Sequence, residues 1–138
     1  MRVAILHFLD TNNSKDKKVI NNLSKALEKN NHSVTVLNGI KDMDNVKLPI
    51  YQYIFVIAKP VGFFSSKINE YISNVLASHG TLIGMKSSAL ILKSSFEFLA
   101  DKACCRLMSS MEKEGMFVNN FSVLTNSDHA TYFGKKLC

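Results

Sequence analysis

The stretch YIFVIAKPVGFF, residues 53–64, followed by SSKINEYI at 65–72, carries the strongest indication of the fold. Its first six residues are apolar and mostly β-branched or aromatic, which is typical of a strand buried on both faces. Residues 59–64 contain a proline and a glycine and are expected to form a loop. Ser65 or Ser66 can cap a helix that follows. Its apolar positions recur at helical spacing: Ile68, Tyr71, Ile72, Val75 and Leu76.

The same alternation of strand and helix extends along the chain in both directions. Strands are expected at 3–9, 32–37, 53–58, 88–92 and 117–124, and helices at 15–30, from 65 onward, at about 99–114 and, in short form, within 125–138. Strands that alternate with helices need right-handed crossovers and form a parallel sheet with helices on both faces. The sequence therefore predicts one α/β domain, residues 1–138, with a doubly wound five-stranded parallel sheet.

Length and composition favour a soluble cytoplasmic protein. A chain of 138 residues with 46% hydrophobic residues is long enough to bury one core. Its strongly apolar runs, such as Ile54 to Ala58, are far shorter than the ~20 residues that a membrane span needs, so we expect no membrane association. The cysteines are Cys104, Cys105 and Cys138, without the Cys-x-x-Cys spacing of a metal or redox site. They are expected to be reduced thiols, with Cys104 or Cys105 in the core.

Charge and histidine content indicate no nucleic-acid or zinc site. The net charge is +6, but the lysines are dispersed, whereas a nucleic-acid binder concentrates cations and aromatics on one element. The four histidines do not pair at metal-ligand spacing. His7, near the end of the first predicted strand, is best interpreted as a hydrogen-bonded structural residue. A patch around Met108 and Met111 could support a homodimer, although packing in the core explains these methionines equally well.

The predicted topology places a ligand site at one edge of the sheet. Ligands of doubly wound sheets bind outside the carboxyl ends of the strands, where the strand order reverses. Lys15, Lys59 and Lys93 would lie at this edge and make it a site for an anionic ligand. The alternative is that each lysine simply extends into solvent.

Three segments together resemble the flavodoxin family, over nearly the whole chain. They are the strand, loop and helix from Tyr53, the segment Val-Ala-Ile-Leu-His-Phe at 3–8 followed by Thr-Asn-Asn-Ser at 11–14, and Ser-Ala-Leu-Ile-Leu at 88–92 with the loop, helix and Gly115 after it. The resemblance implies a flavodoxin-like fold that binds flavin mononucleotide (FMN). It implies electron transfer or flavin reduction with a redox protein as partner. The chemistry would belong to the cofactor, and no side chain can be named as a catalytic acid or base.

The resemblance also implies which residues would bind the cofactor. The first loop would hold the phosphate, and aromatic residues of the second and third loops, Phe63 or Phe64 and Phe96 or Phe98, would stack on the flavin ring. The full set of expected cofactor residues is Thr11, Asn12, Asn13, Ser14, Lys15, Lys59, Pro60, Val61, Gly62, Phe63, Lys93, Ser94, Ser95 and Phe96.

Several departures from the family pattern support a second hypothesis. The first loop has no glycine, and Ala58-Lys59-Pro60 stands where the family has Gly-Ser/Thr-Pro. The chain has no tryptophan and a positive net charge, whereas flavodoxins that carry electrons are acidic. The second hypothesis is a flavodoxin-fold domain that has lost flavin and acts as a binding or regulatory module for another anionic small molecule or a protein.

Overall fold

Within residues 1–59, 65–93 and 97–137, which this computed structural model describes, five parallel strands form one sheet in the order β2-β1-β3-β4-β5. The strands are β1 (Arg2–His7), β2 (Ser33–Asn38), β3 (Tyr53–Ala58), β4 (Lys86–Leu92) and β5 (Phe117–Leu124). The chain passes from β1 outward to β2 and then returns to β3 on the other side of β1. The strand order therefore reverses between β1 and β3, and the predicted doubly wound sheet is confirmed.

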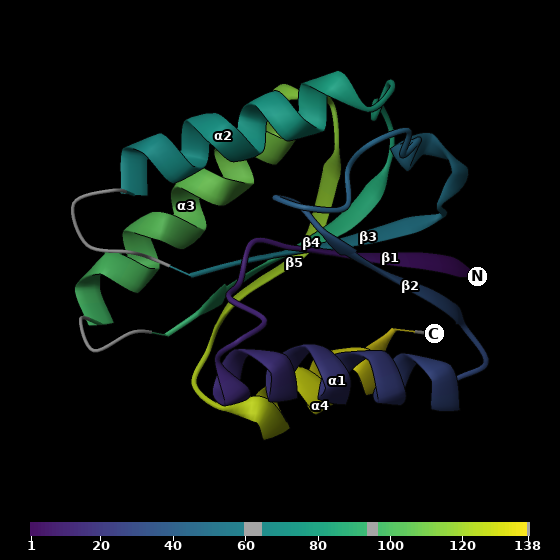
Figure 1. Cartoon of the computed structure of the whole chain (residues 1–138), viewed down its shortest axis with the longest axis vertical. Helices are drawn as coiled ribbons and strands as arrows, with labels where there is room; N and C mark the ends of the chain where they lie inside the picture. Colours follow the sequence, from purple (N-terminus) through teal and green to yellow (C-terminus); the bar gives the residue numbers. More distant parts are fainter. Residues whose placement is uncertain (60–64, 94–96, 138) are drawn as a thin grey trace.

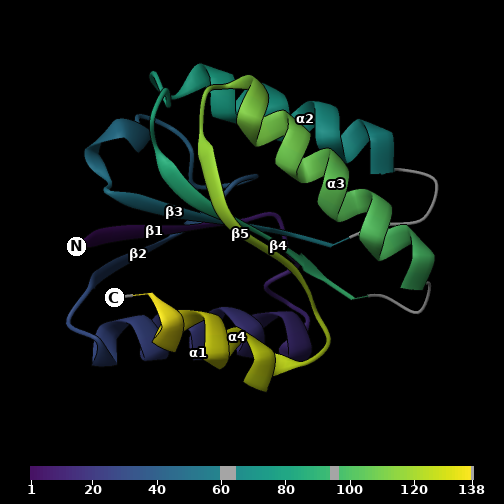
Figure 2. The ribbon, with the colours of Figure 1, turned by 180° about the vertical axis from the view of Figure 1, so that it is seen from behind.

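Helices cover both faces of this sheet (Figures 1 and 2). On one face α1 (Ser14–Lys29) and α4 (Ser127–Lys136) lie side by side. On the other face lie α2 (Ser65–Ser78) and α3 (Glu97–Lys113), and a short 3₁₀ helix, η1 (Leu48–Ile50), belongs to the β2–β3 connection. None of these helices, over the residues that the structure describes, has the length and apolarity needed to span a bilayer.

Two hydrophobic clusters, one on each face, hold the layers together. In β3, Tyr53, Phe55 and Ile57 face α1 and α4, whereas Ile54 and Val56 face α2 and α3. This alternation follows from the two-residue repeat of a strand, and the double coverage explains why the whole strand is apolar. The apolar stripe predicted for α1 is buried against the first cluster: Val19, Ile20, Leu23, Ala26 and Leu27.

The close approach of α4 to α1 depends on Gly134. A Cβ at this position would lie 2.5 Å from Ala26 Cβ and 3.0 Å from the carbonyl oxygen of Leu23. The Asn22 side chain donates to the carbonyl of Ser127 over 3.0 Å, at the start of α4. This contact holds the start of α4 against the middle of α1, and both helices begin at the same edge of the sheet (Figure 1).

The predicted end of the first strand differs from the structure, whereas the expected core residues agree with it. The first strand was expected to reach Leu9 but ends at His7, because the Leu9 amide turns back to donate to His7 Nδ1 over 3.4 Å. Of the two cysteines expected as alternatives for the core, Cys104 is buried and Cys105 is exposed, and Cys138 lies outside the described residues. Met111 is buried and Met108 packs against the same cluster, so the core accounts for both methionines.

Candidate functional site

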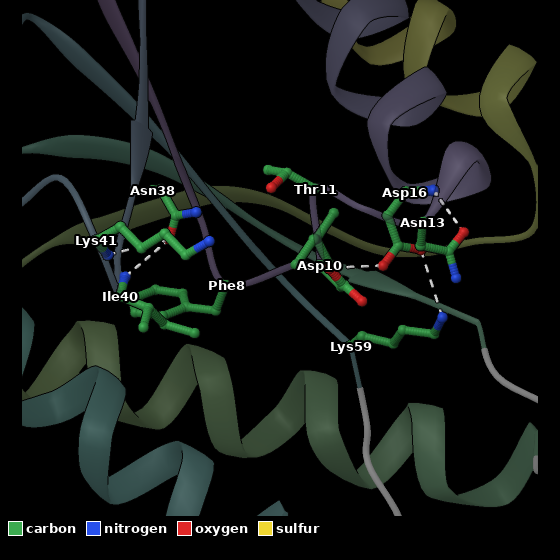
Figure 3. Close-up of a pocket in the computed structure, with 10 residues that line it drawn as sticks. Phe8, Asp10, Thr11, Asn13, Asp16, Asn38, Ile40, Lys41 and Lys59 are labelled. Atoms are coloured by element: carbon green, nitrogen blue, oxygen red, sulfur yellow. Dashed lines mark hydrogen bonds and ion pairs between the residues drawn. The ribbon is translucent and has the colours of Figure 1, made fainter.

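Two neighbouring cavities open at the carboxyl edge of the sheet and share Asp16 and Lys59. The first, here called the β1–β2 cavity, has a volume of about 520 Å³ (Figure 3). Its lining comes from the end of β2, the first turn of α1 and the residues after β1, β2 and β3: Phe8, Leu9, Asp10, Thr11, Asn13, Asp16, Asn38, Ile40, Lys41 and Lys59. The second, here called the lysine cavity, has a volume of about 370 Å³ and is bounded by the start of α1 and the residues after β3, β4 and β5.

The loop between β1 and α1 is organised by hydrogen bonds to its own side chains. Asn13 caps α1, and its Oδ1 accepts the backbone N–H groups of Lys15 over 2.9 Å and Asp16 over 3.4 Å. Asp10 Oδ1 accepts the N–H of Asn12 over 2.9 Å. Asparagine and aspartate favour such positions because their short side chains reach nearby backbone donors.

Asp16, on the first turn of α1, is the buried centre of this loop. Its side chain is 2% exposed, and its Oδ2 accepts the N–H of Asp10 over 3.3 Å. Its Oδ1 forms an ion pair with Lys59 Nζ at 3.4 Å (Figure 3). Oxygens of the loop itself therefore occupy the backbone donors of four of its residues, Asp10, Asn12, Lys15 and Asp16. An external anion would have to compete with the carboxylates of Asp10 and Asp16 for two of these donors and with the Asn13 amide oxygen for the other two.

The β1–β2 cavity has an apolar, aromatic side formed by Phe8. The Phe8 ring meets Tyr71 edge to face, with ring centroids 6.1 Å apart. A Cβ at residue 39 would lie 2.3 Å from the Phe8 ring, so Gly39 leaves the space that the ring fills. Ile40, the next residue, lines the same cavity and is 61% exposed. These side chains offer a surface on which a planar ring can pack.

His7 lies buried at the base of the site and is neutral in the folded protein. Burial lowers the pKa of its imidazole below 6.5, and this effect outweighs the opposing influence of Asp42 and Asp16. Its Nδ1 accepts the Leu9 N–H, which requires that this nitrogen carry no proton. The interpretation of His7 as a structural histidine is supported by these contacts.

The lowered pKa of His7 predicts a loss of stability in mild acid. The unfolded chain, where the imidazole titrates near 6.5, binds a proton more readily than the folded chain, so the free energy of unfolding falls as the pH drops below 6.5. In His7→Asn, whose Oδ1 can accept the same N–H, this part of the decrease should disappear. Urea denaturation of both proteins at about pH 7.5 and about pH 5.5 measures the difference. An equal decrease in both would show that His7 does not contribute.

The structure brings together several residues that the sequence singled out. Lys15, Lys59 and Lys93 line one cavity, while Thr11 and Asn13 line the other. That these residues bind a ligand stays a prediction. Seven residues of the predicted set lie outside the described residues: Pro60, Val61, Gly62, Phe63, Ser94, Ser95 and Phe96. Phe64 also lies outside them, as does the side chain of Phe98.

Sequence reasoning missed other residues of the two cavities. Asp16 could have been noticed as an acid in the first turn after the Asn13 cap, a position that the helix dipole favours. The positions of Phe8, Ile40 and Lys41 depend on how the β2–β3 connection folds back, and no local pattern indicates them. Among the described residues, no group of three or more histidine, cysteine or acidic side chains could hold a metal ion.

Comparison with solved structures identifies the fold of the chain. No family model matches the chain, and no curated protein matches it in sequence. Solved structures do match. Oxidised flavodoxin 2 from Bacillus cereus is 13% identical with a TM-score of 0.72, and the match covers 97% of this chain and 95% of that one. A flavodoxin from the domain Archaea is 16% identical with a TM-score of 0.67, covering 99% and 93%. The chain therefore has a flavodoxin-like fold, as its resemblance in sequence implied.

Proposed function

We propose that this chain binds FMN at the carboxyl edge of its sheet and serves in electron transfer or flavin reduction. The observation that carries the proposal is the β1–β2 cavity, which lies beside the reversal of strand order, where ligands of doubly wound sheets bind. Its volume of about 520 Å³ lies within the usual range of ligand sites. The similarity to solved flavodoxins supports the same ligand class.

The residues present fit the flavin ring better than they fit a phosphate in the β1–α1 loop. Phe8 and Ile40 provide an apolar surface for the ring, and Lys59 stands at the junction of the two cavities. FMN would supply the redox chemistry, and the protein would orient it and set its electrostatic surroundings. A lysine close to the ring stabilises negative charge that forms on reduction.

Titration of the flavin-free protein with FMN tests this proposal, with quenching of flavin fluorescence as the readout. We expect a micromolar dissociation constant. The variant Ile40→Asp should weaken binding by about tenfold, since it removes apolar contact and adds a negative charge near the ligand. Ile83→Asp is the matched control, because Ile83 is 79% exposed and lies outside both cavities. Its affinity for FMN should equal that of the unmodified chain.

The same titration also tests the second candidate function, in which the chain is a binding or regulatory module that has lost flavin. The observation that favours it is the occupation of loop N–H groups by the carboxylates of Asp10 and Asp16. If FMN causes no quenching up to about 1 mM, its binding free energy is weaker than about −4 kcal/mol. This result would overturn the proposal of flavin binding. The carboxyl edge would then be a site for another anion or a protein.

A further inference from the structure

We propose that His79, with both ring nitrogens protonated, clamps the β2–β3 connection (residues 39–52) to the end of α2, and that this clamp is released as the pH rises. His79 directly follows α2, and the connection lies beside this end of the helix (Figures 1 and 2). The connection also supplies Ile40 and Lys41 to the β1–β2 cavity. The clamp is inferred from hydrogen-bond geometry, whereas its effect on ligand affinity rests on the proposed function.

Both ring nitrogens of His79 lie within hydrogen-bond distance of backbone carbonyl oxygens. Nδ1 is 2.7 Å from the carbonyl oxygen of Val75, in the last turn of α2, and Nε2 is 2.9 Å from the carbonyl oxygen of Met43, in the connection. A carbonyl oxygen can only accept, so each nitrogen must donate a proton. A neutral imidazole has a single N–H group. The two bonds together therefore require the imidazolium form.

The position of His79 at the end of a helix favours this charged form. The last four carbonyl groups of a helix have no partner within the helix, and the Val75 carbonyl is one of them in α2. A cation at this end is also stabilised by the helix dipole. His79 is only partly buried, so its charge keeps some contact with water. The imidazolium form is thus compatible with its surroundings.

The charged groups near the ring do not oppose a cation there. Those of the connection are all exposed and their formal charges cancel: Lys41, Asp42, Asp44 and Lys47. Those at the end of α3, which line a cavity beside Gly80, have a net negative charge: Glu112, Lys113 and Glu114. The charged residues of α2 belong to its first two turns, at the far end of the helix from His79: Lys67 and Glu70. The helix end therefore determines which form of the imidazole is preferred.

The contact with Met43 belongs to a wider attachment of the connection to α2. The backbone carbonyl of His79 accepts the N–H of Leu48 over 3.0 Å. The side chains of Met43 and Leu48 are buried in the hydrophobic cluster between the sheet and the helices α2 and α3. Tyr71, on α2, donates to the carbonyl of Gly39 over 3.2 Å. These contacts hold the connection on both sides of the two residues that line the β1–β2 cavity.

A rise in pH should remove the bond to Met43 and leave the bond to Val75. Histidine is the side chain whose charge normally changes between pH 5 and 8. A nitrogen that loses its proton directs a lone pair at a carbonyl oxygen, so an attractive contact becomes repulsive. The bond to Val75 spans four residues, whereas the bond to Met43 spans 36 and requires a long segment to be ordered. The remaining proton therefore stays on Nδ1, and the connection loses its clamp.

Two measurements on the full chain test the clamp without any ligand. In NMR spectra of the chain with ¹⁵N-labelled histidine, both ring nitrogens of His79 should be protonated at about pH 6 and only Nδ1 at about pH 8. Hydrogen exchange, corrected for the intrinsic effect of pH, should show about tenfold weaker protection of the Leu48 amide at the higher pH. This is the size of one charge-assisted hydrogen bond.

Two variants identify His79 as the cause. In His79→Gln, whose side chain does not titrate, protection of the Leu48 amide should be equal at the two pH values. His129→Gln is the matched control, because His129 is on α4, and it should keep the tenfold change. The inference is wrong if the His79 ring carries a single proton at about pH 6. It is also wrong if His79→Gln keeps the full pH dependence of Leu48 protection.

Titration with FMN at both pH values separates this inference from the proposed function. If FMN binds, its affinity should fall more between about pH 6 and about pH 8 in the unmodified chain than in His79→Gln, by about threefold. The comparison with the variant cancels the titration of the FMN phosphate itself. An equal change in both proteins would overturn the link between the clamp and the cavity. If the clamp behaves as expected but FMN does not bind, the clamp stands and the flavin proposal is wrong.

Discussion

Replacing Asp16 with alanine is expected to lower the free energy of unfolding by about 3 kcal/mol, a loss typical of breaking a buried charge pair. The variant loses the ion pair with Lys59 and the bond from the Asp10 N–H, and it leaves a small void beneath the loop. The Lys59 side chain is 32% exposed and can return to water, which keeps the loss at the lower end of the range for buried pairs.

Urea denaturation measures this effect, and two further variants identify its cause. Asp16→Asn keeps an acceptor for the Asp10 N–H and should lose about half as much stability, because only the charge is removed. Asp44→Ala removes an exposed acid of the β2–β3 connection and should change stability by less than about 0.5 kcal/mol. A loss below about 1 kcal/mol in Asp16→Ala would contradict the view that this carboxylate organises the loop.

Replacing Gly134 with valine should have a similar effect through packing. The new Cβ would lie 2.5 Å from Ala26 Cβ and 3.0 Å from the Leu23 carbonyl oxygen. This oxygen belongs to the backbone of α1 and cannot move away without shifting the helix. Valine is a better helix former than glycine by less than about 1 kcal/mol, whereas overpacking a tight contact costs about 1–3 kcal/mol or more. The clash therefore outweighs the gain in helix propensity, and we expect the free energy of unfolding to fall by about 3 kcal/mol.

Chemical denaturation together with hydrogen exchange of the α4 amides tests the second prediction. Faster exchange confined to α4 would show that the helix separates from α1. The control is Lys135→Val, which introduces the same side chain at an exposed neighbouring position and should cost less than about 1 kcal/mol. If Gly134→Val is as stable as this control, the close contact between the helices is not important for stability.

Parts of the fold that depend on local interactions were predicted correctly, whereas parts that depend on distant contacts were not. The ends of β3 were predicted correctly because an apolar strand is bounded there by polar residues and a proline. The buried stripe of α1 was also correct, since helical periodicity is a local signal. Phe8 and Leu9 were assigned to the first strand because they are apolar, yet their positions depend on the His7 side chain and on Gly39.

The candidate site was less predictable because its contacts are long-range. Lys59 and Lys93 could be placed at one edge from strand order alone, since β3 and β4 are neighbours. The partner of Lys59 is Asp16, 43 residues earlier in the chain, and no local pattern pairs them. Thr125 to Ser127 join the lysine cavity only because α4 docks against α1, through contacts such as that from Asn22 to Ser127.

The most direct test of flavin binding is an absorbance spectrum of the purified chain after incubation with FMN and removal of free flavin by gel filtration. We expect flavin absorbance to elute with the protein, close to one FMN per chain, with bands shifted from those of free FMN by the apolar surroundings of Phe8 and Ile40. A colourless protein fraction, with all FMN eluting separately even at millimolar loading, would contradict it.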